Sequence, residues 1–569
     1  MELILAAINA KFIHSSLAIR CLKAAAGPWK DRIQTAEYTI NQDPDFILDD
    51  LYQKQPRAVG FSCYLWNITL IEMLAENLKK LLPHLQIFLG GPEVSYDAET
   101  VLRQNPAVDF IIRGEGEGVF RAYLDQFFGQ NMAYRHLSGI TWRREDGAII
   151  ENPAHPPMDL SLIPFPYGDE PLPAHRILYY ETQRGCPYQC QYCLSSLEKG
   201  VRFLPEHRVQ QELQFFLDQR VPQVKFVDRT FNCNPRHAMM IWRYLIDHDN
   251  GVTNFHMEIT ADLLTQEMID LLGTARPGLF QFEIGVQSTN PDTIAAIKRN
   301  TSFALLTQKV QALQKAHNIH IHLDLIAGLP LEDYDSFARS FDDVYRLNPD
   351  QFQLGFLKLL KGSGLRQDAE KFGIVYRRQP VYEVLYTKDL PYEQVRKLKL
   401  VEEMVETYYN SPKAFYTLRF LTSFLPSAFH LFQALGFFWE SQGGKELKFS
   451  KLDQVRLFWD FVSTLPLSAS QRETARELLR FDLLLAHNEK RIPEALAPHP
   501  AGSKEELRAL AKQLGIASKE PIHFERFTVN VCDLAKDANT KVVFAPTQVL
   551  FRYGHRDAIH KRAQIQQIP

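Results

Sequence analysis

The stretch "ILYYETQRGCPYQCQYC", residues 177–193, joins an apolar run to three cysteines with the spacing C-x3-C-x2-C. The apolar run, 177–183, predicts a buried β-strand, and the thiols of Cys186, Cys190 and Cys193 follow in the loop directly after it. Thiolates bind soft metals, but a structural zinc site normally needs four ligands, and no cysteine pair completes this triplet. The stretch therefore predicts a metal-bearing loop at the carboxyl end of a strand. A zinc site and three unrelated thiols are the alternatives.

The same rhythm of strand and helix continues along the chain. Five more strand candidates follow the cysteines, at 223–228, 255–260, 279–287, 319–328 and 351–359. Six consecutive strand–helix units favour a partial (β/α)6 barrel over residues 176–385. Active sites of such barrels lie on the loops that follow the strands, so we expect the cysteine loop in the active site.

The first 150 residues also alternate strands with helices. Apolar runs lie at 3–8, 58–64, 86–91 and 108–114, and apolar residues at helical spacing predict a helix over 68–82. This order predicts an α/β domain, residues 1–150, with a doubly wound, Rossmann-like parallel sheet. A dinucleotide-binding domain is the alternative. It needs a glycine fingerprint after the first strand, and "AAINAKF" contains no glycine.

Two further segments differ in composition. Residues 151–175 are rich in proline, which predicts an extended linker over the surface. Residues 386–569 predict a mainly helical C-terminal domain with a short β segment within 522–553. Helices are expected at 392–409, 452–462 and 470–487, the last with a capping box from Ser470 to Glu473. This domain is interpreted as a packed helical cap or as a cap that shapes a substrate pocket.

The composition excludes several classes of protein. The net charge of -3 gives no basic excess that would indicate nucleic acid or an anionic membrane as a partner. No apolar run approaches the ~18 residues that cross a bilayer. The apolar start carries Glu2 and predicts a buried strand rather than a signal peptide. Seven cysteines in 569 residues are too few for a disulfide scaffold, which favours a reducing cytoplasm.

The cysteine spacing, with Tyr192 directly before the third cysteine, resembles that of the radical S-adenosylmethionine (SAM) superfamily. The resemblance implies a [4Fe-4S] cluster on Cys186, Cys190 and Cys193, with the fourth iron open to the amine and carboxylate of SAM. It also implies that the reduced cluster splits SAM to a 5′-deoxyadenosyl radical under anaerobic conditions. The usual four-cysteine cluster spacings do not fit this stretch.

The strand ends after the cysteines are similar to segments near SAM in that superfamily. They are "FVDRTFN" (226–232), "FHMEITADLL" (255–264), "FEIGVQS" (282–288) and "DLIAGLP" (324–330). A carboxylate or amide at the end of a barrel strand is well placed to bond a ribose hydroxyl or the methionyl amine. The resemblance implies SAM contacts from Tyr192, Asp228, Glu258, Glu283, Gln287, Ser288 and Gly328. The alternative for each is a structural hydrogen bond at the barrel rim.

Three loops of the first domain resemble those of cobalamin-binding domains that precede radical SAM barrels. They are "SCYLWN" (62–67), "GGPEVS" (90–95) and "RGEGEG" (113–118), at the carboxyl ends of strands, where open sheets bind ligands. The resemblance implies cobalamin contacts from Ser62, Cys63, Tyr64, Trp66, Asn67, Gly90, Gly91, Pro92, Glu93, Gly114, Glu115 and Gly116. The chain lacks an Asp-x-His-x-x-Gly motif, which implies a corrin held by backbone and loops, with no histidine from that motif on the cobalt.

Several interpretations of the first domain stay open. Trp66 is interpreted as a residue over the corrin face or as plain core packing. Cys63 is interpreted as a small buried residue rather than a ligand. Cys233, past the second barrel strand, is interpreted as an inert thiol or as a group near the active site. A domain that has lost its cobalamin is a further alternative.

The combined resemblance implies a cobalamin-dependent radical SAM enzyme that methylates an unactivated carbon of a small-molecule or natural-product-like substrate. An external electron donor of the flavodoxin or ferredoxin type would supply the electron. One alternative keeps both cofactors and performs ring formation, rearrangement or a redox step. A second alternative is a non-catalytic iron–sulfur protein that transfers electrons or senses oxygen.

Overall fold

The computed structural model describes residues 2–129, 133–168, 171–197, 200–411, 413–447, 449–488, 492–497, 502–517, 519–538 and 540–568. The chain forms two compact units. The first consists of Met1–Phe282, Ala295–Ser302 and Leu357–Thr387, and the second of Glu283–Ile294, Phe303–Phe356 and Lys388–Pro569. No helix in the described part of the chain is long and apolar enough to cross a membrane.

The N-terminal part of the first unit is a seven-stranded sheet of order β2-β1-β3-β4-β5-β6-β7. Its strands are β1 (Leu3–Asn9), β2 (Ile33–Thr39), β3 (Ala58–Ser62), β4 (Gln86–Gly90), β5 (Phe110–Ile112), β6 (Ile140–Arg143) and β7 (Ile149–Glu151). The first five are parallel to their neighbours, and β6 and β7 add an antiparallel edge. The predicted parallel sheet is confirmed, whereas the sequence analysis did not identify β2, β6 or β7.

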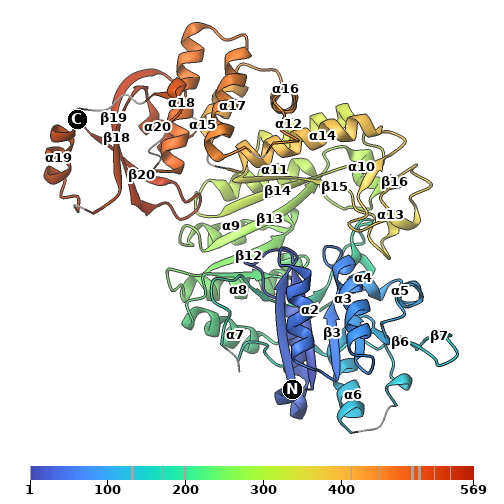
Figure 1. The fold of residues 1–569 in the computed structure, drawn as a ribbon. Coiled ribbons are helices and arrows are strands. Elements are labelled where there is room, and N and C mark those ends of the chain that lie inside the picture. The colour runs from blue at the N-terminus through green and yellow to red at the C-terminus, as the bar shows by residue number, and fades with distance from the viewer. Residues whose placement is uncertain are drawn as a thin grey trace. The chain divides into compact units, whose positions relative to one another are not determined.

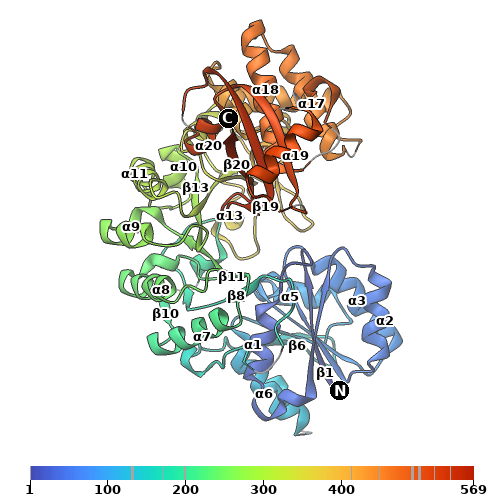
Figure 2. The same ribbon diagram turned by 90° about the vertical axis from the view of Figure 1, so that its left-hand side faces the viewer.

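Helices cover both faces of this sheet. Figure 2 shows α1 (Leu17–Ala25) and α6 (Gly116–Phe128) on one side, and α2 (Pro44–Gln53) and α3 (Ile68–Leu81) on the other. Successive residues of β1 point to opposite faces, so Leu3 and Leu5 join the core under α1 and α6, while Ile4 joins the core under α2 and α3. The helix expected over 68–82 is confirmed as α3. Short helices α4 (Pro92–Ser95) and α5 (Ala98–Gln104) follow β4.

The proline-rich connection between the two sheets contains, among its described residues, one short turn of 3-10 helix, Leu160–Leu162. The expectation that it lies over the surface is wrong for three of its side chains, because Leu160, Ile163 and Tyr167 are buried. The Tyr167 hydroxyl donates to the carbonyl oxygen of Tyr179 at 2.7 Å. The connection is therefore anchored at the first barrel strand.

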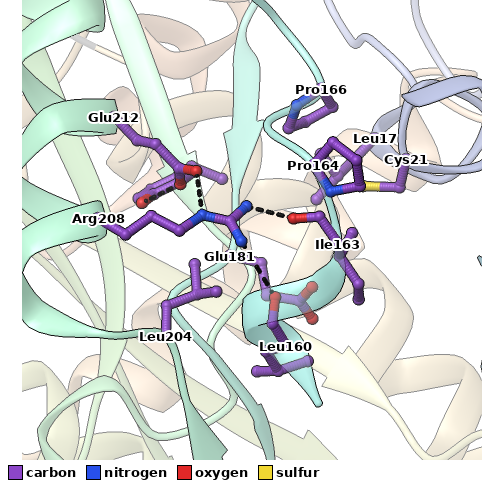
Figure 3. A pocket seen from close by; sticks show the side chains of 11 residues that line it. Leu17, Cys21, Leu160, Ile163, Pro164, Pro166, Glu181, Leu204, Arg208 and Glu212 are labelled. Atoms are coloured by element: carbon purple, nitrogen blue, oxygen red, sulfur yellow. Dashed lines mark hydrogen bonds and ion pairs between the residues drawn. The ribbon is translucent and has the colours of Figure 1, made fainter. Parts of the chain in front are cut away.

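Arg208 of α7 (Glu206–Asp218) fixes this connection, as Figure 3 shows. Its guanidinium donates to Glu212 Oε1 at 2.6 Å and to the carbonyl oxygens of Leu160, at 3.2 Å, and Ile163. The cavity beside it measures about 30 Å³. That volume suits about one water molecule, so the cavity is a packing feature and not a ligand site.

The barrel is an open six-stranded sheet of order β15-β14-β13-β12-β11-β8 (Figure 1). Its strands are β8 (Leu178–Tyr180), β11 (Gln223–Phe226), β12 (Asn254–Ile259), β13 (Phe280–Gln287), β14 (His320–Ala327) and β15 (Gln351–Phe356). Between them lie α7, α8 (Pro235–Asp247), α9 (Gln266–Gly273), α10 (Pro291–Ala296), α11 (Phe303–Gln314) and α12 (Tyr334–Tyr345). Each predicted barrel strand is confirmed, and β8 and β11 run parallel, as do β14 and β15.

A small element group follows the barrel in the first unit: α13 (Gly364–Gln367), β16 (Val375–Tyr376) and β17 (Val384–Tyr386). The C-terminal region of the second unit is mainly helical, as predicted. Its helices are α14 (Tyr392–Met404), α15 (Phe415–Thr422), α16 (Ala428–Ser441), α17 (Lys451–Thr464), α18 (Ala469–Ala486), α19 (Lys504–Gln513) and α20 (Val531–Lys536). The expected β segment is an antiparallel sheet of β18 (Ile522–Val529), β19 (Phe544–Arg556) and β20 (Ala563–Ile568).

The capping box expected at Ser470 is wrong. Helix α18 begins two residues earlier, and Ser468 accepts a hydrogen bond from the N–H of Gln471, whose side chain bonds back to the Ser468 N–H. Both serines carry a suitable partner three residues on, Gln471 for Ser468 and Glu473 for Ser470. The earlier box is used because it adds residues to the helix.

A buried ion cluster joins α18 to the C-terminal sheet. Arg480 is fully buried, and its guanidinium donates to Glu477 Oε1 at 2.6 Å and lies 3.8 Å from Glu525 Oε1. Glu477 also accepts from the Thr528 N–H at 2.7 Å. Since both carboxylates are buried, Arg480 is the cation that makes their burial tolerable.

We expect Arg480→Met to destabilise the protein by roughly 3–5 kcal/mol, because it removes the buried cation between Glu477 and Glu525 and leaves Glu525 with the His523 ring. Arg476→Met on the same helix is the matched control, since its partner Glu473 is half exposed, and we expect it to cost less than about 1 kcal/mol. Urea unfolding of both variants measures the difference. Equal midpoints would show that the buried cluster adds nothing.

Candidate functional site

The cysteine loop begins at a backbone turn that only glycine fits. Strand β9 (Gln183–Gly185) pairs antiparallel with β10 (Val201–Phe203), directly before Cys186. Gly185 has a φ of +93°, and a Cβ there would lie 2.1 Å from the carbonyl oxygen of Gly200. A larger residue would push the two strands apart and move the first thiol.

Two thiols of the motif lie close enough to the third, Cys190, to affect its pKa. All are free, Cys190 is buried, and Cys186 and Cys193 are half-buried. Burial raises the pKa of Cys190; the neighbouring thiols of Cys193 and Cys186 raise it further, and the guanidinium of Arg299 opposes them. Among the described residues, no three His, Cys, Asp or Glu side chains are arranged to hold a metal ion.

A single arginine ties the start of this loop to the N-terminal sheet. Arg184 donates to both carboxylate oxygens of Glu117, with Nη1 3.2 Å from Oε2, and its Nε donates to Glu181 at 2.9 Å. Glu115 lies 3.6 Å from Arg184 and also pairs with Arg202. Burial acts to raise the pKa of Glu115, but hydrogen bonds from Arg202 and the Met158 N–H lower it overall. The carboxylate of Glu115, expected at the corrin, is therefore engaged by arginines.

Asp228 lies under the loop and organises its backbone. The carboxylate is fully buried and accepts hydrogen bonds from the N–H groups of Thr182, at 2.8 Å, and Gln183, at 3.1 Å, and from the Thr182 hydroxyl. Burial raises its pKa to about 7, and these hydrogen bonds act in the opposite direction. The expected SAM contact from Asp228 stays a prediction. The carboxylate supports the segment that leads to Cys186.

Arg299 is a site residue that the sequence analysis missed. Its Nη1 donates to the Tyr192 hydroxyl at 3.0 Å, and its guanidinium also hydrogen-bonds the Cys190 thiol. The carbonyl of Ile297, on the same segment, accepts from the Gln191 N–H at 3.0 Å. A cation beside the cysteine loop suits a cluster of thiolates. No local signal in "AAIKRN" identifies it, because the contact depends on the fold.

Most of the other expected SAM residues lie at or near the ends of barrel strands, whereas Glu283 lies in the middle of β13. In the first unit Glu258 is half-buried near the end of β12. In the second unit Glu283 is half-buried, and Gln287 (φ +72°) and Gly328 (φ +86°) adopt left-handed backbone at the ends of β13 and β14. The Ser288 hydroxyl donates to Glu332 Oε1 at 2.5 Å. Glu332 was not identified from the sequence. Burial raises its pKa to about 7.

The first corrin-type loop presents an aromatic stack at the carboxyl end of β3. The rings of Tyr64 and Trp66 are parallel, with centroids 4.4 Å apart. Trp66 is 41% exposed, and its indole N–H donates to the Ile8 carbonyl at 3.1 Å. Asn67 is buried, and its amide donates to the carbonyls of Ile8 and Ser62. Trp66 is thus a surface residue and not core packing.

The other two loops lie beside it at the same edge of the sheet. Cys63 is buried, burial raises the pKa of its thiol, and its N–H donates to Gly90 at 2.7 Å. The Gly114 N–H lies 3.3 Å from the Ser95 hydroxyl. Gly91 and Gly114 have positive φ, and Pro92 and Gly116 begin α4 and α6.

Glu93 of the second loop is buried, and its carboxylate Oε1 lies 3.1 Å from Lys361 Nζ.

The residues present fit the two groups that the resemblance implies. Three free thiols in one loop, two of which raise the pKa of Cys190, suit an iron–sulfur cluster, and the guanidinium of Arg299 lies beside them. Segments 62–67, 90–95 and 113–118 offer an exposed aromatic stack and glycine backbone for a flat ring, and they contain no histidine. Cys233 is half-buried, and its thiol donates to Gln183 at 3.5 Å.

Three families match successive parts of the chain. Residues 4–124 match the "B12 binding domain", residues 180–344 the "Radical SAM superfamily", and residues 370–551 a "Protein of unknown function (DUF4080)". The first two matches agree with the doubly wound sheet and with the barrel that carries the cysteine loop.

Known proteins resemble the chain over the same region. A 2-(S-pantetheinyl)-carbapenam-3-carboxylate methyltransferase from Streptantibioticus cattleyicolor is 28% identical over 52% of this chain and 46% of its own length. An anaerobic magnesium-protoporphyrin IX monomethyl ester cyclase from Rubrivivax gelatinosus is 24% identical over 57% of this chain and 60% of its own. The structure of the cobalamin-dependent S-adenosylmethionine radical enzyme OxsB with aqua-cobalamin has a TM-score of 0.58 at 12% identity, over 91% of this chain and 81% of that chain.

The chain spans about half the length of the first curated relatives. The likeness to OxsB concerns the fold alone. The matched domains nevertheless define the cofactors, because a radical SAM domain carries a [4Fe-4S] cluster and binds SAM, and a B12-binding domain binds cobalamin. This chain therefore contains a radical SAM domain, with a B12-binding domain before it and a DUF4080 region after it.

Proposed function

We propose that this protein is a cobalamin-dependent radical SAM methyltransferase that acts on an unactivated carbon of a small-molecule substrate. The observation that carries the proposal is the cysteine loop, which is tied directly to the corrin-type loops of the same unit through Arg184 and its glutamates. The methyltransferase relative supports methyl transfer as the reaction. An electron donor of the flavodoxin or ferredoxin type would serve as the external partner.

The residues of the barrel would hold and orient the first cofactor pair. Cys186, Cys190 and Cys193 would ligate three irons of the cluster, and Arg299 would keep a cation beside the Cys190 thiolate. When bound, the cluster and SAM supply a radical that removes a hydrogen atom from carbon. Glu258, a polar group near the end of β12 in the same unit as the cysteines, would orient SAM. The fixed strand keeps this group in place before substrate arrives.

The residues of the first domain would hold the second cofactor. The Tyr64–Trp66 stack and the glycines of the second and third loops would contact the corrin face and edge. Cobalamin supplies a transferable methyl group when bound. The three loop segments contain no histidine that could ligate the cobalt, so the backbone and aromatic side chains would do the holding.

A non-methylating reaction with the same cofactors is the second candidate. The likeness to a magnesium-protoporphyrin ester cyclase favours it, because that relative is named for ring formation. The two candidates share the cluster and corrin sites. They differ in whether the methyl group of SAM is transferred to the substrate.

We expect Cys186→Ala, Cys190→Ala and Cys193→Ala each to abolish 5′-deoxyadenosine formation by the anaerobically reconstituted protein with SAM and a strong reductant. Loss of a ligand should reduce the rate by more than the roughly 10- to 100-fold typical of outer-shell changes. Deoxyadenosine by chromatography and bound iron by colorimetric assay are the measurements.

Cys532→Ala is the matched control, because Cys532 is a buried free thiol of α20 in the second unit. It should retain iron and deoxyadenosine formation. A Cys186→Ala protein that keeps its cluster and its rate would rule out the ligand assignment.

Methyl transfer predicts that S-adenosylhomocysteine accumulates only when cobalamin is bound. A SAM molecule would remethylate the cobalt after each transfer, whereas a ring-forming reaction consumes no SAM methyl group. We would measure S-adenosylhomocysteine and 5′-deoxyadenosine in parallel, with and without cobalamin. Extracts of cells that lack the active protein serve as the source of substrate. Deoxyadenosine without S-adenosylhomocysteine under all conditions would favour the second candidate.

A further inference from the structure

A short segment after the barrel touches both the corrin-type loops and the cysteine loop. This segment, Leu359–Arg366 with the sequence "LLKGSGLR", is called the strap here, and it belongs to the first unit. Figure 1 shows α13, in which the strap ends, beside α4 of the second corrin-type loop. None of the residues expected at the cofactors lies in it.

The strap is anchored to α4 by a buried ion pair and a close backbone approach. Lys361 Nζ lies 3.1 Å from Glu93 Oε1, and Glu93 is 4% exposed. The Tyr382 hydroxyl donates to the same oxygen. A buried carboxylate requires such a cation, so Lys361 fixes the strap to this loop. Gly362 packs against Tyr96, and a Cβ added at Gly362 would lie 2.8 Å from Cγ of the Tyr96 ring.

The strap is anchored to the cysteine loop through backbone. The Leu365 N–H donates to the carbonyl oxygen of Gln191 at 2.9 Å, between the second and third cysteines. Gly364 lies against the Gln191 side chain, where a Cβ would come within 2.3 Å of Oε1. The anchors to the two loops are consecutive in sequence, with Lys361 and Gly362 on one side and Gly364 and Leu365 on the other.

Ser363 stands between the two sets of anchors. It is fully buried, and its hydroxyl has no hydrogen-bond partner among the described residues. A buried hydroxyl without a partner costs free energy. Ser363 is therefore held in the strap by the anchors on either side of it, because its hydroxyl makes no hydrogen bond among the described residues.

We propose that the strap is a positioning element that sets the distance between the corrin-type loop at Glu93 and the cysteine loop at Gln191. The inference rests on the proposed function, since the strap matters only if both cofactors are present. Lys361 and Gly362 act through the protein and not on the substrate. A displacement of about 1 Å between reacting groups costs on the order of 100-fold in rate, so a short rigid link here controls the reaction.

The test compares two glycines with the same backbone conformation. Gly362 has a φ of +87° and packs on Tyr96, whereas Gly147 has a φ of +85° and no atom within 4 Å of an added Cβ. Gly362→Ala and Gly147→Ala therefore share the backbone strain, and only the first displaces a neighbour. Lys361→Met with Glu93→Gln is the second strap variant, which removes both buried charges so that neither is left unpaired.

The readout is the magnetic interaction between the reduced cluster and cob(II)alamin in the reconstituted, dithionite-reduced protein, by pulsed electron paramagnetic resonance. Exchange of the Leu365 amide, which donates to the Gln191 carbonyl, is measured in parallel. We expect Gly147→Ala to match the wild type. Gly362→Ala should retain iron and corrin, and both strap variants should change the dipolar coupling and exchange the Leu365 amide about tenfold faster.

The outcomes separate the two proposals. A wild-type protein that takes up no corrin would overturn the proposed function, and the strap's role with it. A wild type that binds both cofactors, with coupling and exchange unchanged in Gly362→Ala and in the double variant, would overturn the strap alone. If Gly362→Ala fails to fold while Gly147→Ala folds, the double variant decides by the same measurement.

Discussion

The site depends on the burial of Arg184 among Glu117, Glu181 and Glu115. The arginine stands two residues before the first cysteine of the motif, and two of its partners lie in the third corrin-type loop. Buried charges of this kind stabilise a structure only when every partner is in place. Loss of one partner would leave a buried charge unpaired, and the network links the start of the cysteine loop to the edge of the N-terminal sheet. Gly185 and Asp228 then give the loop its path, because one permits the close turn and the other binds the backbone before it.

Much of the fold could be predicted because its cores are periodic. The apolar runs of β1, β3 and β4 and the apolar face of α3 identify a buried parallel sheet, and the barrel strands repeat at regular intervals. Strand β2 was not predicted, because it lies at the edge of the sheet and mixes buried with half-buried residues. The hairpin of β6 and β7 was not predicted for a similar reason, since most of its residues are partly exposed.

Some residues of the candidate site could likewise be predicted from the sequence, and others could not. The cysteines and the loop glycines could be identified because their spacing is local. Arg299, Glu332 and Lys361 could not, because each acquires its role from a partner that is distant in sequence. A single sequence contains no information on which lysine reaches Glu93. The expected residues Glu93 and Glu115 are paired with cations of the protein before any cofactor binds, and Asp228 is bonded by neutral N–H and hydroxyl donors.

The strap also has a consequence for the order of assembly. Its backbone bond to Gln191 joins the cysteine loop to a segment that the ribosome makes only after every barrel strand. Until then the carbonyl between the second and third thiols lacks this partner, and the loop has one fewer restraint on its shape. A nascent chain would thus expose three thiols on a pliable loop for as long as the barrel is being synthesised. Synthesis past α13 ends that interval, so iron and sulfide delivered earlier would meet a loop that lacks this restraint.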